Sequence, residues 1–150
     1  MATKKFDPAD FEAFLDLLPK AADGRALRHV VEVRHDSFRS PDLVAMARSR
    51  GIAIAIAADG SYPQIADPTA SFIYARIMGT REDEEAGYSP EALDRWAARA
   101  KAWASGQIPD GFDLVTTEPP PQPRDVFLYV ISGHKPKNPA AALALIERTR

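Results

Sequence analysis

Cysteine is absent from this sequence of 150 residues, which excludes disulfide bonds, a thiolate nucleophile and metal sites built on cysteine. No apolar run approaches the roughly 20 residues that a membrane-spanning helix needs. The N-terminal stretch MATKKFDPADF has basic residues but lacks the apolar core of a secretion signal. Positive and negative charges nearly cancel, with a formal net charge of −2, so the composition provides no attraction to nucleic acid or to an anionic membrane. We therefore expect a cytoplasmic protein with neither of these partners.

The composition that remains is typical of one soluble globular domain. Hydrophobic residues make up 45% of the chain and charged residues 27%, which are proportions typical of water-soluble globular proteins. A chain of this length can bury a sizeable core, and it shows no repeat beyond an alternation of helix and strand patterns. We expect a single α/β domain over residues 1–150.

Four segments have the pattern of amphipathic helices. Each begins with a capping residue and a proline, and its apolar residues then recur at helical spacing. The predicted helices cover 6–20, 40–51, 89–106 and 138–150, with Asp7, Ser40, Ser89 and Asn138 as their caps.

Four nearly continuous apolar runs predict strands over 29–35, 52–59, 71–79 and 125–133. Strands of this kind, separated mostly by helices, favour a parallel sheet covered by helices. Two irregular segments, the acidic 80–88 and the proline-rich connector 108–124, are predicted to be solvated surface loops.

Side-chain alternation gives every predicted strand one aliphatic face. These faces carry Val31, Val33, Ile52, Ile54, Ile56, Ile73, Ala75, Ile77, Val126, Leu128 and Val130. The opposite faces carry aromatic, small and charged residues: Val30, Glu32, Arg34, Ala53, Ala55, Ala57, Asp59, Phe72, Tyr74, Arg76, Phe127, Tyr129 and Ile131. The aliphatic faces suit a layer of helices, and the charges gather near the carboxyl ends of the strands.

Ligands of parallel α/β folds bind beyond the carboxyl ends of the strands, so these charges define a candidate site. The candidate catalytic residues are Glu32, His35 and Asp59, and the candidate ligand-binding residues are Arg34, Arg76 and Lys135. Guanidinium groups match a phosphate or carboxylate ligand, so a small anion is the expected ligand.

Each of these residues also has a purely structural interpretation. Glu32 and Asp59 could neutralise the two arginines inside the fold, His35 could bond to the backbone, and Lys135 could belong to an ordinary solvated turn. Glu32, His35 and Asp59 are proper ligand types for a metal ion, but no spacing typical of a metal site occurs, and the cofactor stays unknown.

Several segments together resemble the YecE-like family (domain of unknown function 72). They are DPADFEAFLDLLP, VEVRHDSF, IAIAAD, FIYARIMG, the helix with two tryptophans, and FLYVISGHK followed by NPAAALAL. The resemblance covers nearly the whole chain but only the C-terminal half of the family domain, and it implies half of a (βα)8 TIM-type barrel. It implies no reaction, because the activity of the family is not established.

Within this resemblance the polar positions that match are Glu32, Arg34, His35, Asp59 and Arg76. The third strand departs from the family pattern, because Met78 stands where a histidine is usual. Phe38 likewise replaces the usual tryptophan, and the first barrel strands have no counterpart here.

We expect four parallel strands with helices on one side, as half of a (βα)8 barrel. The alternative is an open three-layer sheet with helices on both faces. A half barrel would expose Phe72, Tyr74, Phe127 and Tyr129 together with two strand edges, which predicts a homodimer. Two functions remain: an enzyme or enzyme remnant that binds a small anion, and a non-catalytic scaffold that acts through self-association.

Overall fold

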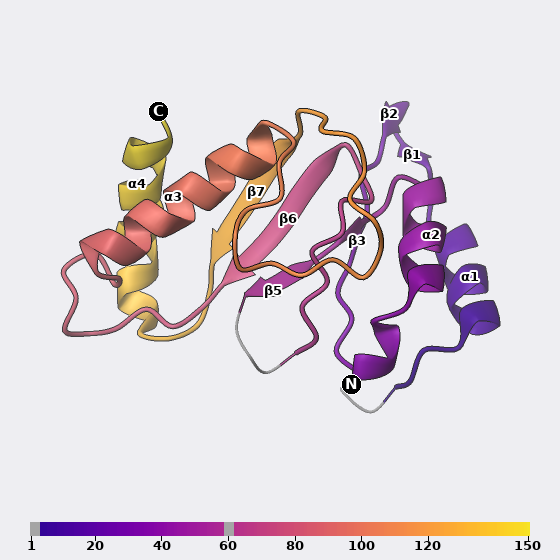
Figure 1. Cartoon of the computed structure of the whole chain (residues 1–150), viewed down its shortest axis with the longest axis horizontal. Coiled ribbons are helices and arrows are strands. Elements are labelled where there is room, and N and C mark those ends of the chain that lie inside the picture. The colour runs from indigo at the N-terminus through magenta and orange to yellow at the C-terminus, as the bar shows by residue number, and fades with distance from the viewer. Residues whose placement is uncertain (1–3, 59–61) are drawn as a thin grey trace.

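The computed structural model describes residues 4–58 and 62–150, and their helices and strands alternate along the chain. The helices are α1 (Pro8–Asp16), α2 (Pro41–Ser49), α3 (Pro90–Ala104) and α4 (Asn138–Thr149), with short 3-10 turns η1 (Asp36–Phe38) and η2 (Lys135–Lys137). The strands are β1 (Ala21–Ala22), β2 (Arg25–Ala26), β3 (Val30–Val31), β4 (Ala53–Ile54), β5 (Ile56–Ala58), β6 (Phe72–Ile77) and β7 (Asp125–Val130). Figure 1 shows α3 lying across β6 and β7, and α1 and α2 at the other end of the molecule.

Strands β3 to β7 pair in sequence order, and every pair is parallel, which confirms the predicted parallel α/β arrangement. β3 pairs with β4, β5 pairs with β6, and β6 pairs with β7. β4 and β5 belong to one extended segment, Ala53–Ala58, whose first part pairs with β3 and whose second part pairs with β6. This segment therefore joins the two groups of strands.

The helices begin largely where the caps predict. Asp7, Ser40 and Ser89 each accept a hydrogen bond from a backbone N–H in the first turn of α1, α2 and α3. The prediction for Asn138 is wrong, because η2 runs directly into α4 and gives Asn138 helical dihedral angles. Its side-chain oxygen instead accepts the hydroxyl of Thr80 at 2.7 Å.

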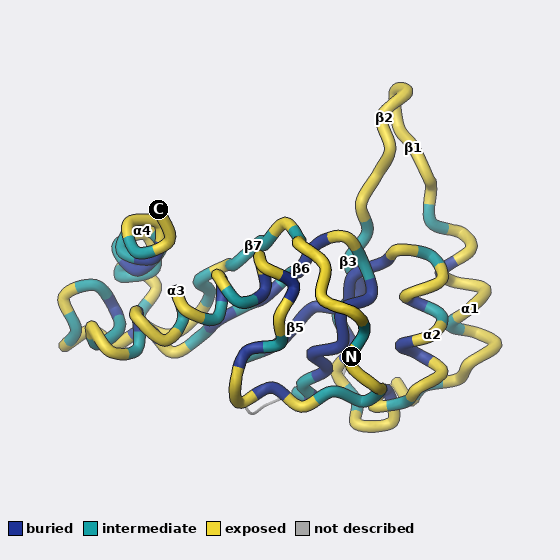
Figure 2. The backbone as a smooth tube through the Cα atoms, turned by 45° about the horizontal axis from the view of Figure 1, so that its top comes forward, coloured by how far each residue is buried: buried dark blue, intermediate teal, exposed yellow. Residues whose placement is uncertain are grey.

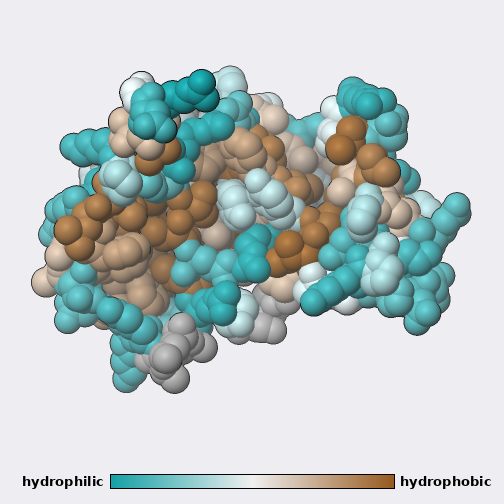
Figure 3. Space-filling view, turned by 180° about the vertical axis from the view of Figure 1, so that it is seen from behind, coloured by the Kyte–Doolittle hydropathy of each residue, from teal (hydrophilic) through white to brown (hydrophobic). Residues whose placement is uncertain are grey.

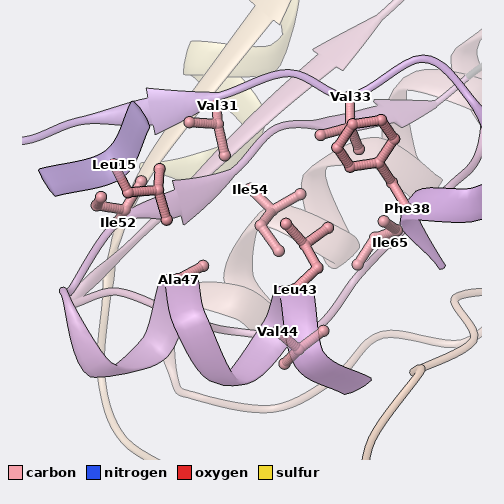
Figure 4. Close-up of a cluster of buried hydrophobic side chains, with 10 residues drawn as sticks. All are labelled: Leu15, Val31, Val33, Phe38, Leu43, Val44, Ala47, Ile52, Ile54 and Ile65. Atoms are coloured by element: carbon pink, nitrogen blue, oxygen red, sulfur yellow. The ribbon is translucent and has the colours of Figure 1, made fainter. Parts of the chain in front are cut away.

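The hydrophobic core lies on the aliphatic face of the strands, where all four helices contribute. Figure 4 shows Val31 and Ile54 pointing from β3 and β4 toward the side of α2 and Leu43, with Val33, which follows β3, beside Phe38. Further along the sheet, α3 and α4 pack on β6 and β7 through a second set of buried residues: Ile73, Ala75, Ile77, Leu93, Ala97, Trp103 and Leu145.

The connector 108–124 is a solvated surface loop only in its later, proline-rich part, and its first part is packed against the sheet. Phe112 is only 8% exposed and packs against Trp103 and Ile56, on the side of β5 and β6 that α3 also covers. Asp67 anchors the next residues, because its carboxylate accepts the backbone N–H groups of Val115 and Thr116 at 2.7 and 2.9 Å. The described residues between β5 and β6, 62–71, form no helix, and the connector covers the sheet there.

Within the described residues, a small hairpin is the strand pair that the sequence did not predict. β1 and β2 pair antiparallel around Asp23 and Gly24, which both have positive φ. The hairpin projects from the body of the molecule and is exposed along its length (Figure 2). An Asp-Gly pair is a known signal for a tight hairpin turn, so this element was detectable.

Replacement of Gly106 by alanine should destabilise the fold more than the same change at Gly51. Both glycines follow a helix and have positive φ, which costs an alanine about 1 to 2 kcal/mol. A Cβ at Gly106 would also lie within 3.0 Å of the Gln122 backbone, whereas one at Gly51 meets nothing within 4 Å. Thermal unfolding followed by circular dichroism measures both variants, and equal melting temperatures would contradict the close approach of Gln122.

Replacement of Asp67 by alanine should release the connector. The change leaves two backbone N–H groups and the Thr116 hydroxyl without their acceptor, which costs at least about 2 kcal/mol. Limited proteolysis should then cut within 108–124 faster than in the unmodified chain. Asp113→Ala is the matched control, because Asp113 is an exposed aspartate of the same connector, and unchanged cleavage in Asp67→Ala would show that the carboxylate is not the anchor.

Candidate functional site

Glu32 lies between two arginines just beyond the carboxyl end of β3. Its Oε1 accepts a hydrogen bond from Nε of Arg34 at 2.8 Å, and Nη2 of Arg34 lies 2.7 Å from the same oxygen. Its Oε2 accepts Nη1 of Arg76, which comes from β6. The structure therefore brings together three of the predicted site residues, on the face of the sheet opposite to the helices, and we call them the Glu32 cluster.

The Glu32 cluster carries one more positive than negative charge. Glu32 and Arg76 are mostly covered, with side chains 22% and 24% exposed, whereas Arg34 is 42% exposed. The Arg34 guanidinium lies over the ring of Tyr62 at 4.9 Å, a stacking arrangement that favours the cation. The hydrogen bond that Arg34 donates to Glu32 raises the pKa of Arg34 above its usual value, so Arg34 stays charged.

Two tyrosines continue this face next to Arg76. Arg76 is the register partner of Tyr129 across the β6–β7 pair, and the rings of Tyr74 and Tyr129 are 4.9 Å apart. Tyr129 is 45% exposed. Phenol groups and guanidinium groups therefore border the same open surface.

His35 is near this cluster in sequence, but its side chain forms a hydrogen bond with the backbone of η1. It is the N-cap of η1, and its Nδ1 accepts the backbone N–H of Ser37 at 3.1 Å and lies 2.8 Å from the Ser37 hydroxyl. This geometry holds Nδ1 of His35 at the start of η1.

Lys135, a further candidate residue, is not joined to the cluster by an ion pair within 4–58 and 62–150. It is an exposed residue at the start of η2, beyond the end of β7. Asp59 lies outside the described residues.

Sequence reasoning missed a buried hydrogen-bond hub where β6 and β7 end. The hydroxyl of Thr80, a residue only 4% exposed, lies within 3.2 Å of oxygens of Ser132, His134 and Asn138. The backbone N–H of His134 also donates to the carbonyl of Thr80 at 2.7 Å. Nothing in the acidic segment 80–88 indicated this role, because threonine is common in solvated loops. The hub holds the segment that carries Lys135 against the end of β6.

Toward the amino ends of the strands, the same face is aromatic. Phe72 and Phe127 meet edge to face at 5.7 Å, and the Arg28 guanidinium lies 5.2 and 4.8 Å from their ring centres. Phe72 is only 3% exposed, so the prediction that this ring is exposed is wrong. Arg28, held by Asp125 at 2.7 Å, and the neighbouring strand cover it.

A pocket of about 420 Å³ opens on the other side of the Glu32 cluster, between β3 and α1. Its lining combines charged and aromatic residues: Lys4, Asp10, Phe11, Phe14, Glu32, Val33, Arg34 and Phe38. Seen from the side opposite α3, hydrophobic residues form a broad area of this surface, broken by hydrophilic residues (Figure 3). The pocket therefore places charged and aromatic side chains next to Glu32 and Arg34.

The cluster presents two guanidinium groups, and few of its described groups are free for acid–base chemistry. Its one described carboxylate already accepts hydrogen bonds from both guanidinium groups. Within 4–58 and 62–150, no group of three or more histidine, aspartate or glutamate side chains is placed to bind a metal ion. None of the helices in that same part of the chain is long and apolar enough to cross a membrane.

Comparison with curated proteins and with solved structures finds no match for this chain. A family model does match, over residues 2–150, and that family is described as "Protein of unknown function DUF72". Because the match covers nearly every residue, the chain belongs to this family, the YecE-like family that its motifs resemble.

Proposed function

We propose that this protein binds a small anion, a phosphate or a carboxylate, through Arg34 and Arg76 at the carboxyl ends of its parallel strands. The observation that carries the proposal is the sharing of one carboxylate by two guanidinium groups. One positive charge is therefore not balanced within the Glu32 cluster. Arginine forks match phosphate and carboxylate oxygens in pairs, which makes such an anion the natural ligand.

The accessibility of the cluster supports binding over a purely structural role. A buried ion pair excludes water and binds nothing else, whereas Arg34 exposes 42% of its side chain. An approaching anion would thus reach a guanidinium that is already held in place by Glu32 and Tyr62. Preorganised donors of this kind lose little freedom on binding.

The fold supports the same place for the ligand. We infer that the parallel strands form half of a (βα)8 barrel. The strands pair in sequence order, and all four helices pack on one face of them. Ligands of such barrels bind at the face formed by the carboxyl ends of the strands. Arg34 and Arg76 lie at that end of β3 and β6.

An enzymatic role would require Glu32 to release at least one arginine. When an anion takes over one guanidinium, one oxygen of Glu32 loses its donor and becomes able to accept a proton. Anion binding is thus the first step in either case, and it can be tested without knowing a reaction.

Replacement of Glu32 by glutamine should weaken the fold in chloride buffer and strengthen its response to phosphate. The change removes the internal competitor and leaves two positive charges facing each other. Phosphate at 100 times its dissociation constant adds about 2.7 kcal/mol, or a rise of about 5 to 10 °C in melting temperature for a domain of this size. Melting temperatures measured with phosphate, acetate and chloride at constant ionic strength give this response.

Two controls accompany that measurement. Arg76→Met should abolish the response to phosphate, whereas Asp94→Asn, which unpairs Arg148 at 2.8 Å on the helical side, should leave it unchanged. If Glu32→Gln loses stability but neither it nor the unmodified chain responds to phosphate or acetate, the cluster is a structural ion-pair network and the proposal fails.

A further inference from the structure

We propose that two copies of this chain join edge to edge, with β7 of each copy pairing with β3 of the other, and so close an eight-stranded barrel. Both edges of the sheet are open within the described chain. β3 pairs only with β4 there, and β7 pairs only with β6. Open edges present unpaired N–H and C=O groups that accept another strand.

The edge of β7 is well suited to accept a strand. Its six residues pair with β6 in unbroken register, from Phe72 opposite Asp125 to Ile77 opposite Val130. N–H groups of a parallel strand alternate between its two sides. Asp125 and Ile131 donate toward the β6 side, so the residues between them at even positions direct their N–H groups to the open edge. This edge carries no bulge or proline that would block pairing.

Exposed hydrophobic side chains mark the same two flanks. Within 4–58 and 62–150, the large ones that remain exposed are Phe14, Leu17, Leu27, Tyr129, Leu143 and Ile146. The first three lie on α1 and the segment that leads into β3, and the last three lie on β7 and on α4, which packs beside β7. Each flank therefore has an apolar surface next to an open edge, and a soluble monomer seldom leaves two such surfaces uncovered.

A second copy fits these flanks because each chain has one open edge at β3 and one at β7. Joining β7 to β3 is a head-to-tail contact, and such contacts form closed rings when the rotation between copies closes. Four strands from each copy make eight, and the interior of an eight-stranded barrel is filled by side chains. The alanines of the Ala53–Ala58 segment and the aromatic rings of β6 and β7 provide a mixture of small and large residues for that interior.

The closed ring would also complete the anion site, and this part rests on the function proposed above. Parallel pairing places the carboxyl end of β7 of one copy beside the carboxyl end of β3 of the other. Lys135, which follows β7, would then approach Arg34 of the second copy. Each site would contain Arg34 and Arg76 from one chain and Lys135 from the other, which explains why Lys135 is remote from the cluster within one chain.

Light scattering at micromolar concentration should give a particle of about 33 kDa, twice the chain mass of 16.4 kDa. Leu143→Glu should halve that mass without unfolding the protein, because Leu143 is 64% exposed. Ala98→Glu is the matched control on the outer surface of α3, where Ala98 is exposed, and it should leave the mass unchanged. A particle of 16.4 kDa for the unmodified chain, or an open series of larger species, would overturn the proposal.

Cross-linking distinguishes the ring from a face-to-face dimer. Because the sequence has no cysteine, each introduced cysteine is the single reactive thiol of its chain. In the ring, α1 of one copy lies beside α4 of the other, whereas the two α1 helices lie on opposite sides. A short bismaleimide should therefore link an equimolar mixture of Leu17→Cys and Leu143→Cys chains, and should link neither variant to itself. Self-linking of either variant, or no linking in the mixture at a mass of 33 kDa, would reject the ring.

The two proposals fail separately. The mass and the cross-links are measured in chloride buffer, so they test the ring without an anion. If the ring forms, Lys135→Ala should reduce the phosphate-induced rise in melting temperature, while the dimer mass stays the same. A ring whose melting temperature never responds to phosphate would disprove the anion site alone.

Discussion

The structure depends on a single constraint, the alternation of side chains along its parallel strands. One face of each strand is aliphatic and is buried against helices, with Ile54 and Ile77 among its buried residues. The other face carries charges and aromatic rings that no helix of the core clusters covers. Since a slip of one residue in register would exchange the two faces, the positions of Glu32 and Arg76 follow from the same pattern that builds the core.

This dependence explains how much could be predicted from the sequence. Strand periodicity was enough to place Arg34 and Arg76 on one surface, and capping residues followed by prolines were enough to locate the helix starts, although the cap itself was right in only three of the four helices. The role of Asn138 could not be read in this way, because it depends on Thr80, which is 58 positions away in sequence. The burial of Phe112 was hidden for a similar reason, since prolines predict the path of the connector but not the surface on which it lies.

The ends of the strands could be predicted less well than their faces. β3 is only Val30–Val31, and the following residues continue toward η1 without a partner strand in the described chain. A run of apolar residues indicates which segments can be strands, but the length of a ladder is set by its neighbours. Where a neighbour is lacking, as on the outer side of β3, the ladder stops early.

The split strand of the sheet has a consequence for how the molecule unfolds. The core consists of one group of residues around α1 and α2 and further groups around α3 and α4. The Ala53–Ala58 segment pairs with β3 in its first part and with β6 in its second, while the connector contributes Val115 to the first group and Phe112 to another. If the residues around α1 and α2 unfold, these two segments lose contacts there, and part of the core around α3 and α4 becomes exposed. The same holds in the opposite direction. Two cores that could have melted independently are thereby coupled into one cooperative unit.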